Sequence, residues 1–313
     1  VRQGTPSPNN NKRATFRSEG EFESKLFEHT INYNNVFGNH NISAVAGFSN
    51  QTFDHPIFRF TTIEGNPEVE DPYTNRWNNI GILGRVNYTY QDKYLTSITF
   101  RRDGSSLFSE NNRWGNFPSA SVAWRISKED FWVVPAVNDL KLRASYGTLG
   151  NSEFLQPWRY YAVINPFPRA VFGPNEVEQI GAIVTQLANS NLRWERKKTI
   201  NIGLEAAMFN NVFTVTADYF IAKSEDVLVD LPISLTTGNA GGNPAVNAAS
   251  LQNTGFELTL GFRPKQGKDF SWDASLNFTT INNEVIAFGT ETTKYTQLGD
   301  ARTELGRSIG EWY

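Results

Sequence analysis

The sequence contains no cysteine, so disulfide bonds and thiolate chemistry are excluded. No apolar run approaches the roughly 20 residues that a membrane-spanning helix needs, and no helical periodicity extends beyond about two turns. The formal net charge of −3 provides no basic field for nucleic acid. A mean hydropathy of −0.44 would suit a water-soluble protein. Membrane proteins built from strands also keep this value low, because half of their strand positions face a polar lumen.

Strict alternation of apolar and polar residues dominates the chain, and it is clearest over residues 199–221. On either side of Asn210-Asn211, every second residue is apolar. Because asparagine tolerates the positive φ of tight turns, this pattern predicts a β-hairpin with a two-residue turn. The alternation returns over residues 271–279, where Trp272, Leu276 and Phe278 share one face.

The same alternation predicts ten strands, most of them longer than the roughly 5 or 6 residues usual in globular sheets. Tilted strands that cross a membrane need about 9 to 11 residues. The pattern therefore predicts an all-β fold, an antiparallel transmembrane β-barrel. The predicted strands are residues 22–34, 40–53, 76–91, 93–103, 115–126, 140–150, 195–209, 212–226, 251–264 and 269–282.

The connections between these strands alternate in length along the chain. Short ones lie near residues 35–39, 92, 210–211 and 265–268, and 127–139 is intermediate in length but takes a short position in the alternation. Long ones cover residues 54–75, 104–114, 151–194 and 227–250. Outer-membrane barrels have this arrangement, with short periplasmic turns at one end and long extracellular loops at the other.

Aromatic residues flank the short connections, which is where a membrane interface would select them. They are Tyr33, Phe37, Tyr90, Tyr94, Trp124, Phe131, Trp132, Phe209, Phe213, Phe262, Phe270 and Trp272. The alternative is a soluble all-β module whose aromatics belong to an ordinary core, and detergent-free extraction would identify it.

The alternation also assigns candidate residues to each environment. Ile200, Ile202, Leu204, Val215 and Leu276 are predicted to face lipid, and Asn201, Glu205, Asp218, Asp273 and Asn277 to face the lumen. Candidate contacts to a ligand or a lid on the long loops are Tyr73, Trp77, Arg102, Asp103, Phe154, Trp158, Tyr160 and Tyr161. For the charged pair the alternative is an ion pair that ends a strand, and for the aromatics it is a loop that packs on itself.

Catalytic and metal-binding patterns are weak. His29, His40 and His55 are the only histidines, and no Ser/His/Asp or Cys/His set accompanies them. We therefore expect no enzyme activity, no catalytic or metal site and no cofactor. The acidic segment with Glu64, Glu68, Glu70 and Asp71 has no known calcium-loop spacing, so a solvated loop is the simpler interpretation.

Several segments, in order and spacing, resemble the barrel of the SusC/RagA-type TonB-dependent outer-membrane transporter family. Among them are Gly84-Arg85-Val86-Asn87-Tyr88, Asp92-Lys93-Tyr94-Leu95, Arg101-Arg102-Asp103-Gly104-Ser105-Ser106, Asn191-Leu192-Arg193-Trp194-Glu195, Asn253-Thr254-Gly255-Phe256-Glu257 and Gly306-Arg307-Ser308-Ile309-Gly310-Glu311-Trp312-Tyr313. The resemblance extends over about residues 20–313. It implies that residues 1–313 form a central part of a barrel of about 22 strands, without the family's plug domain and last strands. The chain is then expected to be a fragment or a partial description of a longer protein.

The resemblance also implies a location and partners. The barrel would lie in the bacterial outer membrane and import glycan or peptide fragments. A SusD-like surface lipoprotein would close it as a lid, and the TonB complex would act through the missing plug. A siderophore or metal-complex receptor of the TonB-dependent type stays an alternative, as does a soluble binding module. A membrane-barrel enzyme lacks the converging acids and histidines that it would need.

Overall fold

The computed structural model describes residues 2–3, 14–63, 69–152, 155, 159–165, 169–172, 177–230, 233, 236, 243–264, 270–289, 295–298 and 301–312. Its main element is one 12-stranded antiparallel sheet. The long strands are β3 (Glu23–Phe37), β4 (His40–Ile63), β5 (Val69–Tyr90), β6 (Tyr94–Ser105), β7 (Trp114–Arg125), β8 (Val137–Asn151), β13 (Glu195–Met208), β14 (Phe213–Asp230), β15 (Ala245–Phe262) and β16 (Ala274–Phe288). At one edge lie β1 (Arg2–Gln3) and β2 (Ala14–Gly20), and β2 and β3 both pair with β4.

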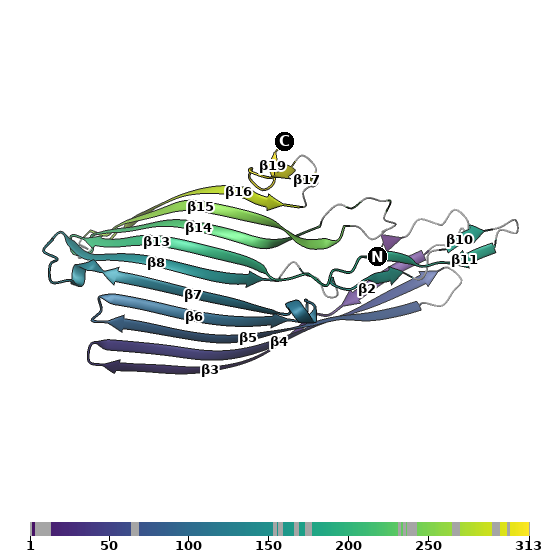
Figure 1. The fold of residues 1–313 in the computed structure, drawn as a ribbon, viewed down its shortest axis with the longest axis horizontal. Coiled ribbons are helices and arrows are strands. Elements are labelled where there is room, and N and C mark those ends of the chain that lie inside the picture. The colour runs from purple at the N-terminus through teal and green to yellow at the C-terminus, as the bar shows by residue number, and fades with distance from the viewer. Residues whose placement is uncertain are drawn as a thin grey trace.

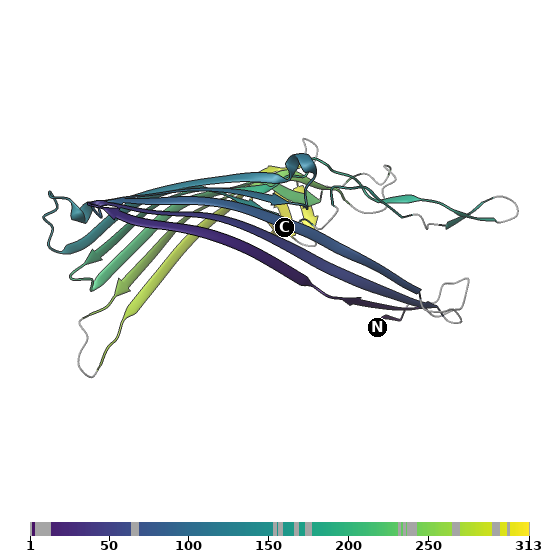
Figure 2. The same ribbon diagram turned by 90° about the horizontal axis from the view of Figure 1, so that it is seen from below.

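Strands adjacent in the chain are adjacent in the sheet, and the sheet is strongly curved (Figures 1 and 2). Two pairings depart from this order. β2 pairs with β4 rather than with β3, and β8 pairs with β13 across the long segment 152–194. That segment carries two small hairpins, β9 (Val163–Asn165) with β12 (Ile183–Gln186) and β10 (Arg169–Phe172) with β11 (Val177–Ile180). A further small sheet joins β17 (Tyr295–Leu298), β18 (Ala301–Glu304) and β19 (Glu311–Trp312).

All ten predicted strands correspond to strands of the main sheet, β3–β8 and β13–β16. The prediction that 54–75 is a loop was wrong, because β4 continues to Ile63 and β5 begins at Val69. These extensions pair in register as far as Thr61 with Val69, so backbone hydrogen bonding continues past Pro56 and Pro72. The last predicted strand began too early, since β16 starts at Ala274 and runs on to Phe288.

The short connections gather at one end of the sheet, on the left in Figure 1. The turn predicted at Asn210-Asn211 spans residues 209–212 instead, with positive φ at Phe209, Asn210 and Asn211. The connection after β7 holds a short 3-10 helix, Ile126–Lys128. A second one, Glu110–Asn112, lies in the connection between β6 and β7 at the opposite end. Within the described residues, no helix is long and apolar enough to span a membrane.

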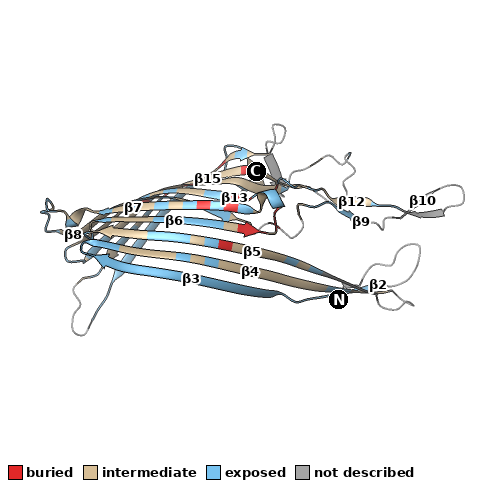
Figure 3. Ribbon diagram, turned by 60° about the horizontal axis from the view of Figure 1, so that its bottom comes forward, coloured by how far each residue is buried: buried red, intermediate tan, exposed pale blue. Residues whose placement is uncertain are grey.

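Burial is concentrated near the end with the long connections, where red segments appear on the strands in Figure 3. The buried cluster there consists of Leu107, Phe108, Phe117, Leu155, Leu192 and Trp194. We call it the rim core, because it lies at the rim of the sheet where the connection between β6 and β7 meets the segment between β8 and β13. Elsewhere the sheet has no second layer packed on it within the described residues.

Candidate functional site

The register of the sheet aligns large apolar side chains into one continuous surface. Across β8, β13 and β14, Tyr146 lies opposite Ile200, and Ile200 lies opposite Ile221. Two residues further along each strand, the paired side chains on this face are again apolar, as for Ile202 and Tyr219. We call this surface the apolar face. Its members include Val86, Ile98, Val122, Trp124, Leu142, Tyr146, Ile200, Ile202, Leu204, Val215, Tyr219, Leu260, Leu276 and Phe278. Many are well exposed, with Ile202 at 58% and Leu276 at 61%.

The opposite surface, the polar face, carries the alternate residues of the same strands. It includes Ser97, Thr99, Ser121, Ser145, Asn201, Glu205, Thr216, Asp218, Glu257, Thr259, Asn277 and Thr279, and its apolar exceptions include Leu83, Leu95, Phe117, Leu149, Phe220 and Ile281. Three cavities of about 790, 680 and 490 Å³ are lined largely by such residues. The polar face is therefore the concave side of the sheet. All five predicted lipid-facing residues lie on the apolar face, whereas Asn201, Glu205, Asp218 and Asn277 lie on the polar face.

An ion network crosses three strands on the polar face. Lys141 Nζ on β8 is 2.6 Å from Glu205 Oε2 on β13, and Arg143 Nε is 3.2 Å from Glu205 Oε1. Arg143 also donates from Nη2 to Asp218 Oδ2 on β14 at 2.6 Å. Glu205 and Asp218 were both predicted from the sequence to face the lumen, and in the structure Arg143 contacts both of them. The network fixes polar side chains along the wall of the concave side.

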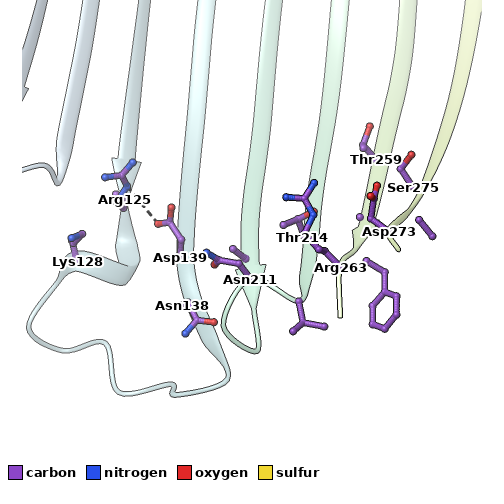
Figure 4. Close-up of a pocket in the computed structure, with 15 residues that line it drawn as sticks. Arg125, Lys128, Asn138, Asp139, Asn211, Thr214, Thr259, Arg263, Asp273 and Ser275 are labelled. Atoms are coloured by element: carbon purple, nitrogen blue, oxygen red, sulfur yellow. Dashed lines mark ion pairs between the residues drawn. The ribbon is translucent and has the colours of Figure 1, made fainter. Parts of the chain in front are cut away.

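The 790 Å³ cavity lies where the polar face meets the short-turn end (Figure 4). Arg125 and Asp139 approach each other there, with 3.4 Å between Nε and Oδ1. Asp273, the fifth residue predicted to face the lumen, lines the same cavity just before β16. The cavity lining carries both signs of charge, from Arg125, Lys128 and Arg263 against Asp139 and Asp273.

The short-turn end also holds a carboxylate with a strongly shifted pKa. Glu129 Oε1 accepts hydrogen bonds from the Tyr94 hydroxyl at 2.5 Å and from Trp124 Nε1 at 2.9 Å, and Oε2 accepts one from Lys93 Nζ at 3.1 Å. These donors, with Tyr94 first, lower the pKa of Glu129 from 4.5 to about 2. The ionised carboxylate thus connects the β7–β8 turn to the aromatic ends of β6 and β7.

At the long-loop end, the rim core closes one end of the 680 Å³ cavity, since Phe117 and Trp194 line both. The Trp194 ring lies 5.0 Å from that of Phe108 and 5.6 Å from that of Phe117. Its Nε1 donates to the backbone oxygen of Arg113 at 3.1 Å. Trp194 therefore joins the connection before β13 to the one between β6 and β7.

Two polar residues, the half-buried Asn247 and the buried Glu195, form hydrogen bonds that connect β8, β14 and β15 to the segment before β13 and to the start of β13. Asn247 Oδ1 accepts from the Arg193 backbone N–H at 2.9 Å, while Nδ2 donates to the backbone oxygens of Arg193 and Asp226, both at 2.7 Å. The buried Glu195 accepts from Asn151 Nδ2 and from the Leu228 N–H, each at 2.8 Å. Arg193 is paired with Asp226 at 2.5 Å, and this hydrogen bond raises the pKa of Arg193.

Sequence reasoning missed the structural role of these rim residues. Leu192, Arg193, Trp194 and Glu195 were noticed only as part of a family-like segment, and Asn247 was assigned to a loop. The available signal was the unusual grouping of apolar, charged and aromatic residues directly before a predicted strand. Their contacts extend to residues 80 or more positions away, which local patterns do not reveal.

The predicted ligand or lid contacts are distributed over the rim. Trp77 stacks on Phe53 with ring centroids 4.8 Å apart, and Trp77 and Tyr160 both pack against the rim core. The Tyr160 and Tyr161 rings are 4.2 Å apart, and Tyr161 is exposed. Phe154, Trp158 and the side chain of Tyr73 lie outside the described residues, as do Glu64, Glu68 and the side chains of Glu70 and Asp71.

Arg102 and Asp103 lie on opposite faces of β6. Asp103 is on the polar face and accepts from Arg101 Nε at 2.7 Å. Arg102 is on the apolar-face side, with its guanidinium 5.1 Å from the Trp114 ring. The two residues therefore cannot act on one ligand from the same side. Within the described residues, no group of three His, Asp or Glu side chains could hold a metal ion.

The family described as "TonB dependent receptor-like, beta-barrel" matches residues 2–307. The chain is 34% identical to TonB-dependent receptor P3 of Formosa agariphila over 83% of its own length and 27% of that protein. It is 34% identical to TonB-dependent receptor SusC of Bacteroides thetaiotaomicron over 73% of its length and 23% of SusC. The chain thus spans about a quarter of the length of these relatives.

A solved structure described as the RagAB peptide transporter has the same fold. The two superpose with a TM-score of 0.80 at 23% identity, over 97% of this chain and 34% of the other. At that identity the likeness concerns the fold alone. Together with the family match, it confirms the predicted antiparallel barrel segment and the resemblance to SusC/RagA-type transporters.

Proposed function

The chain belongs to the TonB-dependent receptor-like β-barrel family, and from that premise we propose that residues 1–313 form part of the wall of a nutrient-import barrel. TonB-dependent receptor barrels are outer-membrane proteins, and their family consists of transporters rather than enzymes. In this proposal the apolar face contacts lipid and the polar face lines the lumen.

One observation carries the proposal, namely the separation of side chains between the two faces. A surface of exposed Ile, Leu, Val, Phe and Tyr side chains across β5–β8 and β13–β16 is far larger than the apolar patches that soluble monomers expose. Lipid is the environment that makes such a surface favourable, and pairing between neighbouring strands satisfies the backbone polar groups inside the sheet. The paired charges of the polar face suit a water-filled interior.

For the substrate, we propose glycan or peptide fragments. The 34% identity with SusC and the fold shared with the RagAB peptide transporter support this class. We further propose a SusD-like lipoprotein as the lid, seated on the long-loop end, and the TonB complex as the energy source acting through a plug outside this chain. The rim core supports the lid, because it holds the connections after β6 and β8 in one packed unit.

The orientation of the faces is tested by a matched pair of substitutions in the full-length protein. Leu204→Arg places a charge on the apolar face, and Asn201→Arg places the same charge on the polar face of the same strand. We expect Leu204→Arg to cost about 2–4 kcal/mol if it lies at mid-depth, and Asn201→Arg to cost little. Folding is scored in lipid vesicles from heat-dependent mobility on gels. Equal folding of Leu204→Arg and wild type would contradict the assignment of this face to lipid.

The substrate class is tested by growth of a deletion strain on defined sources of carbon, nitrogen or iron. We expect a growth defect on oligosaccharides or on oligopeptides that the full-length gene restores. A defect confined to ferric siderophores would replace this substrate proposal with the siderophore alternative. Recovery of the protein in the detergent-free soluble fraction would contradict transport altogether.

A further inference from the structure

A cluster of cations stands on the apolar-face side of the sheet, close to its long-loop end. Arg196 and Lys198 on β13 and Lys223 on β14 point to the same face of the sheet as Ile200 and Ile221, at positions nearer the long-loop end. The register places Lys198 opposite Lys223 and Arg196 opposite Glu225. The Lys198 and Lys223 ammonium groups both reach Glu225, at 2.6 and 3.0 Å, which confirms that these side chains share one surface. We call these four residues the basic cluster.

The position of the basic cluster along β13 is set by the end of the apolar run. Outward residues of this strand are Met208, Ala206, Leu204, Ile202 and Ile200, after which the pattern changes to Lys198 and Arg196. At about 3.3 Å per residue the apolar run covers roughly 26 Å of strand. A tilt of about 40° reduces this to roughly 20 Å, slightly less than the apolar band of outer-membrane barrels, which is about 25 Å. The cluster thus begins where the hydrocarbon layer ends and lipid headgroups begin.

The charges of the basic cluster do not cancel. Glu225 supplies one carboxylate against three cations, and the next carboxylate in the Lys223 row, Glu284, is two strands away. Strands lie about 4.8 Å apart, so that separation is roughly 10 Å. Among the described residues, Arg196 has no carboxylate within ion-pair distance, and it is exposed. An excess of two positive charges is left facing away from the lumen.

We propose that the basic cluster binds the phosphate groups of lipid headgroups in the outer leaflet. A phosphate accepts hydrogen bonds from guanidinium and ammonium groups, and three such groups on two adjacent strands can contact one headgroup. A cation near an anionic lipid surface contributes roughly fivefold in affinity. This inference rests on the proposed function, because it requires the apolar face to contact the bilayer with the long connections outside.

The alternative is that Glu225 and water accept all the hydrogen bonds of the three cations, so that the cluster binds no lipid. Matched variants of the full-length protein separate the two. The triple variant Arg196→Gln, Lys198→Gln and Lys223→Gln removes the cations but keeps hydrogen-bonding side chains. Lys197→Gln removes a cation from the same strand on the opposite face and serves as control. Lys198→Gln alone replaces the triple variant if that one fails to fold.

Binding is measured by native mass spectrometry of the purified protein in detergent, titrated with diphosphoryl lipid A, with fully dephosphorylated lipid A or with inorganic phosphate. We expect wild type and Lys197→Gln to bind diphosphoryl lipid A at least tenfold more tightly than the triple variant. Lys198→Gln alone should weaken binding about fivefold relative to Lys197→Gln. Dephosphorylated lipid A and inorganic phosphate should bind weakly to all variants.

Equal affinity of wild type and the triple variant for diphosphoryl lipid A would overturn the proposal, and so would equal binding of the two lipid forms or retention of inorganic phosphate. Failure of the proposed function gives a different result, because Leu204→Arg would then fold in vesicles as wild type does. The two failures are therefore distinguishable.

Discussion

Arg143 and Asp218 form an ion pair although their strands, β8 and β14, do not pair with each other. The two side chains meet over Gly203 of the intervening strand β13, with 2.6 Å between Nη2 and Oδ2. A Cβ atom at position 203 would lie 2.5 Å from Asp218 Oδ1 and 2.7 Å from Arg143 Nε. The absence of a side chain on β13 is what allows the contact.

Gly203→Ala should therefore displace the Arg143–Asp218 pair. We expect the free energy of unfolding to fall by about 1–3 kcal/mol, as is usual for overpacking. Urea unfolding of the full-length protein in lipid vesicles measures it. Gly84→Ala is the control, because a Cβ there meets nothing within 4 Å. An equal effect of the two substitutions would show that the close approach does not matter.

Trp194→Ala should loosen the rim core. Removal of a buried aromatic side chain costs about 3–5 kcal/mol, and the Arg113 carbonyl would keep only the Ser105 N–H as its donor. Hydrogen exchange should accelerate in residues 105–113 and 189–195, and change little at the short-turn end. Phe131→Ala, at a side chain that is 63% exposed, is the matched control. Unchanged exchange in Trp194→Ala would contradict the role of the rim core.

Glu129 gives the short-turn end an acid-sensitive contact. Its folded pKa of about 2 lies below the value of 4.5 expected when unfolded, so the contribution to stability is fully present above pH 4.5. It should be lost as the pH falls from 4.5 towards 2. Thermal unfolding at stepped pH measures the effect. Glu129→Gln should flatten this part of the profile, whereas Asp130→Asn, at an exposed neighbour, should not.

Asn247→Ala should loosen the contact of β14 and β15 with the segment before β13. Three hydrogen bonds disappear, and the backbone groups of Arg193 and Asp226 lose their partners, at a cost of about 1–3 kcal/mol. Limited proteolysis should cut these segments faster. Asn34→Ala, at an exposed position on the edge strand β3, provides the comparison. Identical cleavage patterns for the two variants would show that the hydrogen bonds of Asn247 do not hold these segments together.

Strand positions were predictable because the two faces of this sheet meet different environments. Residues such as Ile202 and Asn201 alternate regardless of what lies elsewhere in the chain, so a short window of sequence is enough. The predicted ends failed where backbone pairing alone continues a strand, as around Pro56 and Pro72. The Asn210-Asn211 turn was also misjudged, because Phe209 adopts positive φ as well.

The candidate contacts were predictable only in part. Alternation alone separates Arg102 from Asp103, since adjacent residues of a strand point to opposite faces. By contrast, the bond from Trp194 to Arg113 joins two segments far apart in the chain, and no local pattern encodes it. The basic cluster depends on the register between β13 and β14, which the length of the turn sets.

The pairing of β8 with β13 has a consequence for the order of folding. Hairpins such as β13–β14 close over four residues, 209–212, whereas β8 meets β13 only after residues 152–194 have been looped out. On simple polymer grounds this longer closure costs about 2 kcal/mol more conformational entropy. We expect strands β3–β8 and strands β13–β16 to pair first, as two separate sheets. The pairing of β8 with β13 should form last, together with the burial of Leu155 and Leu192 and the hydrogen bond between Glu195 and Asn151.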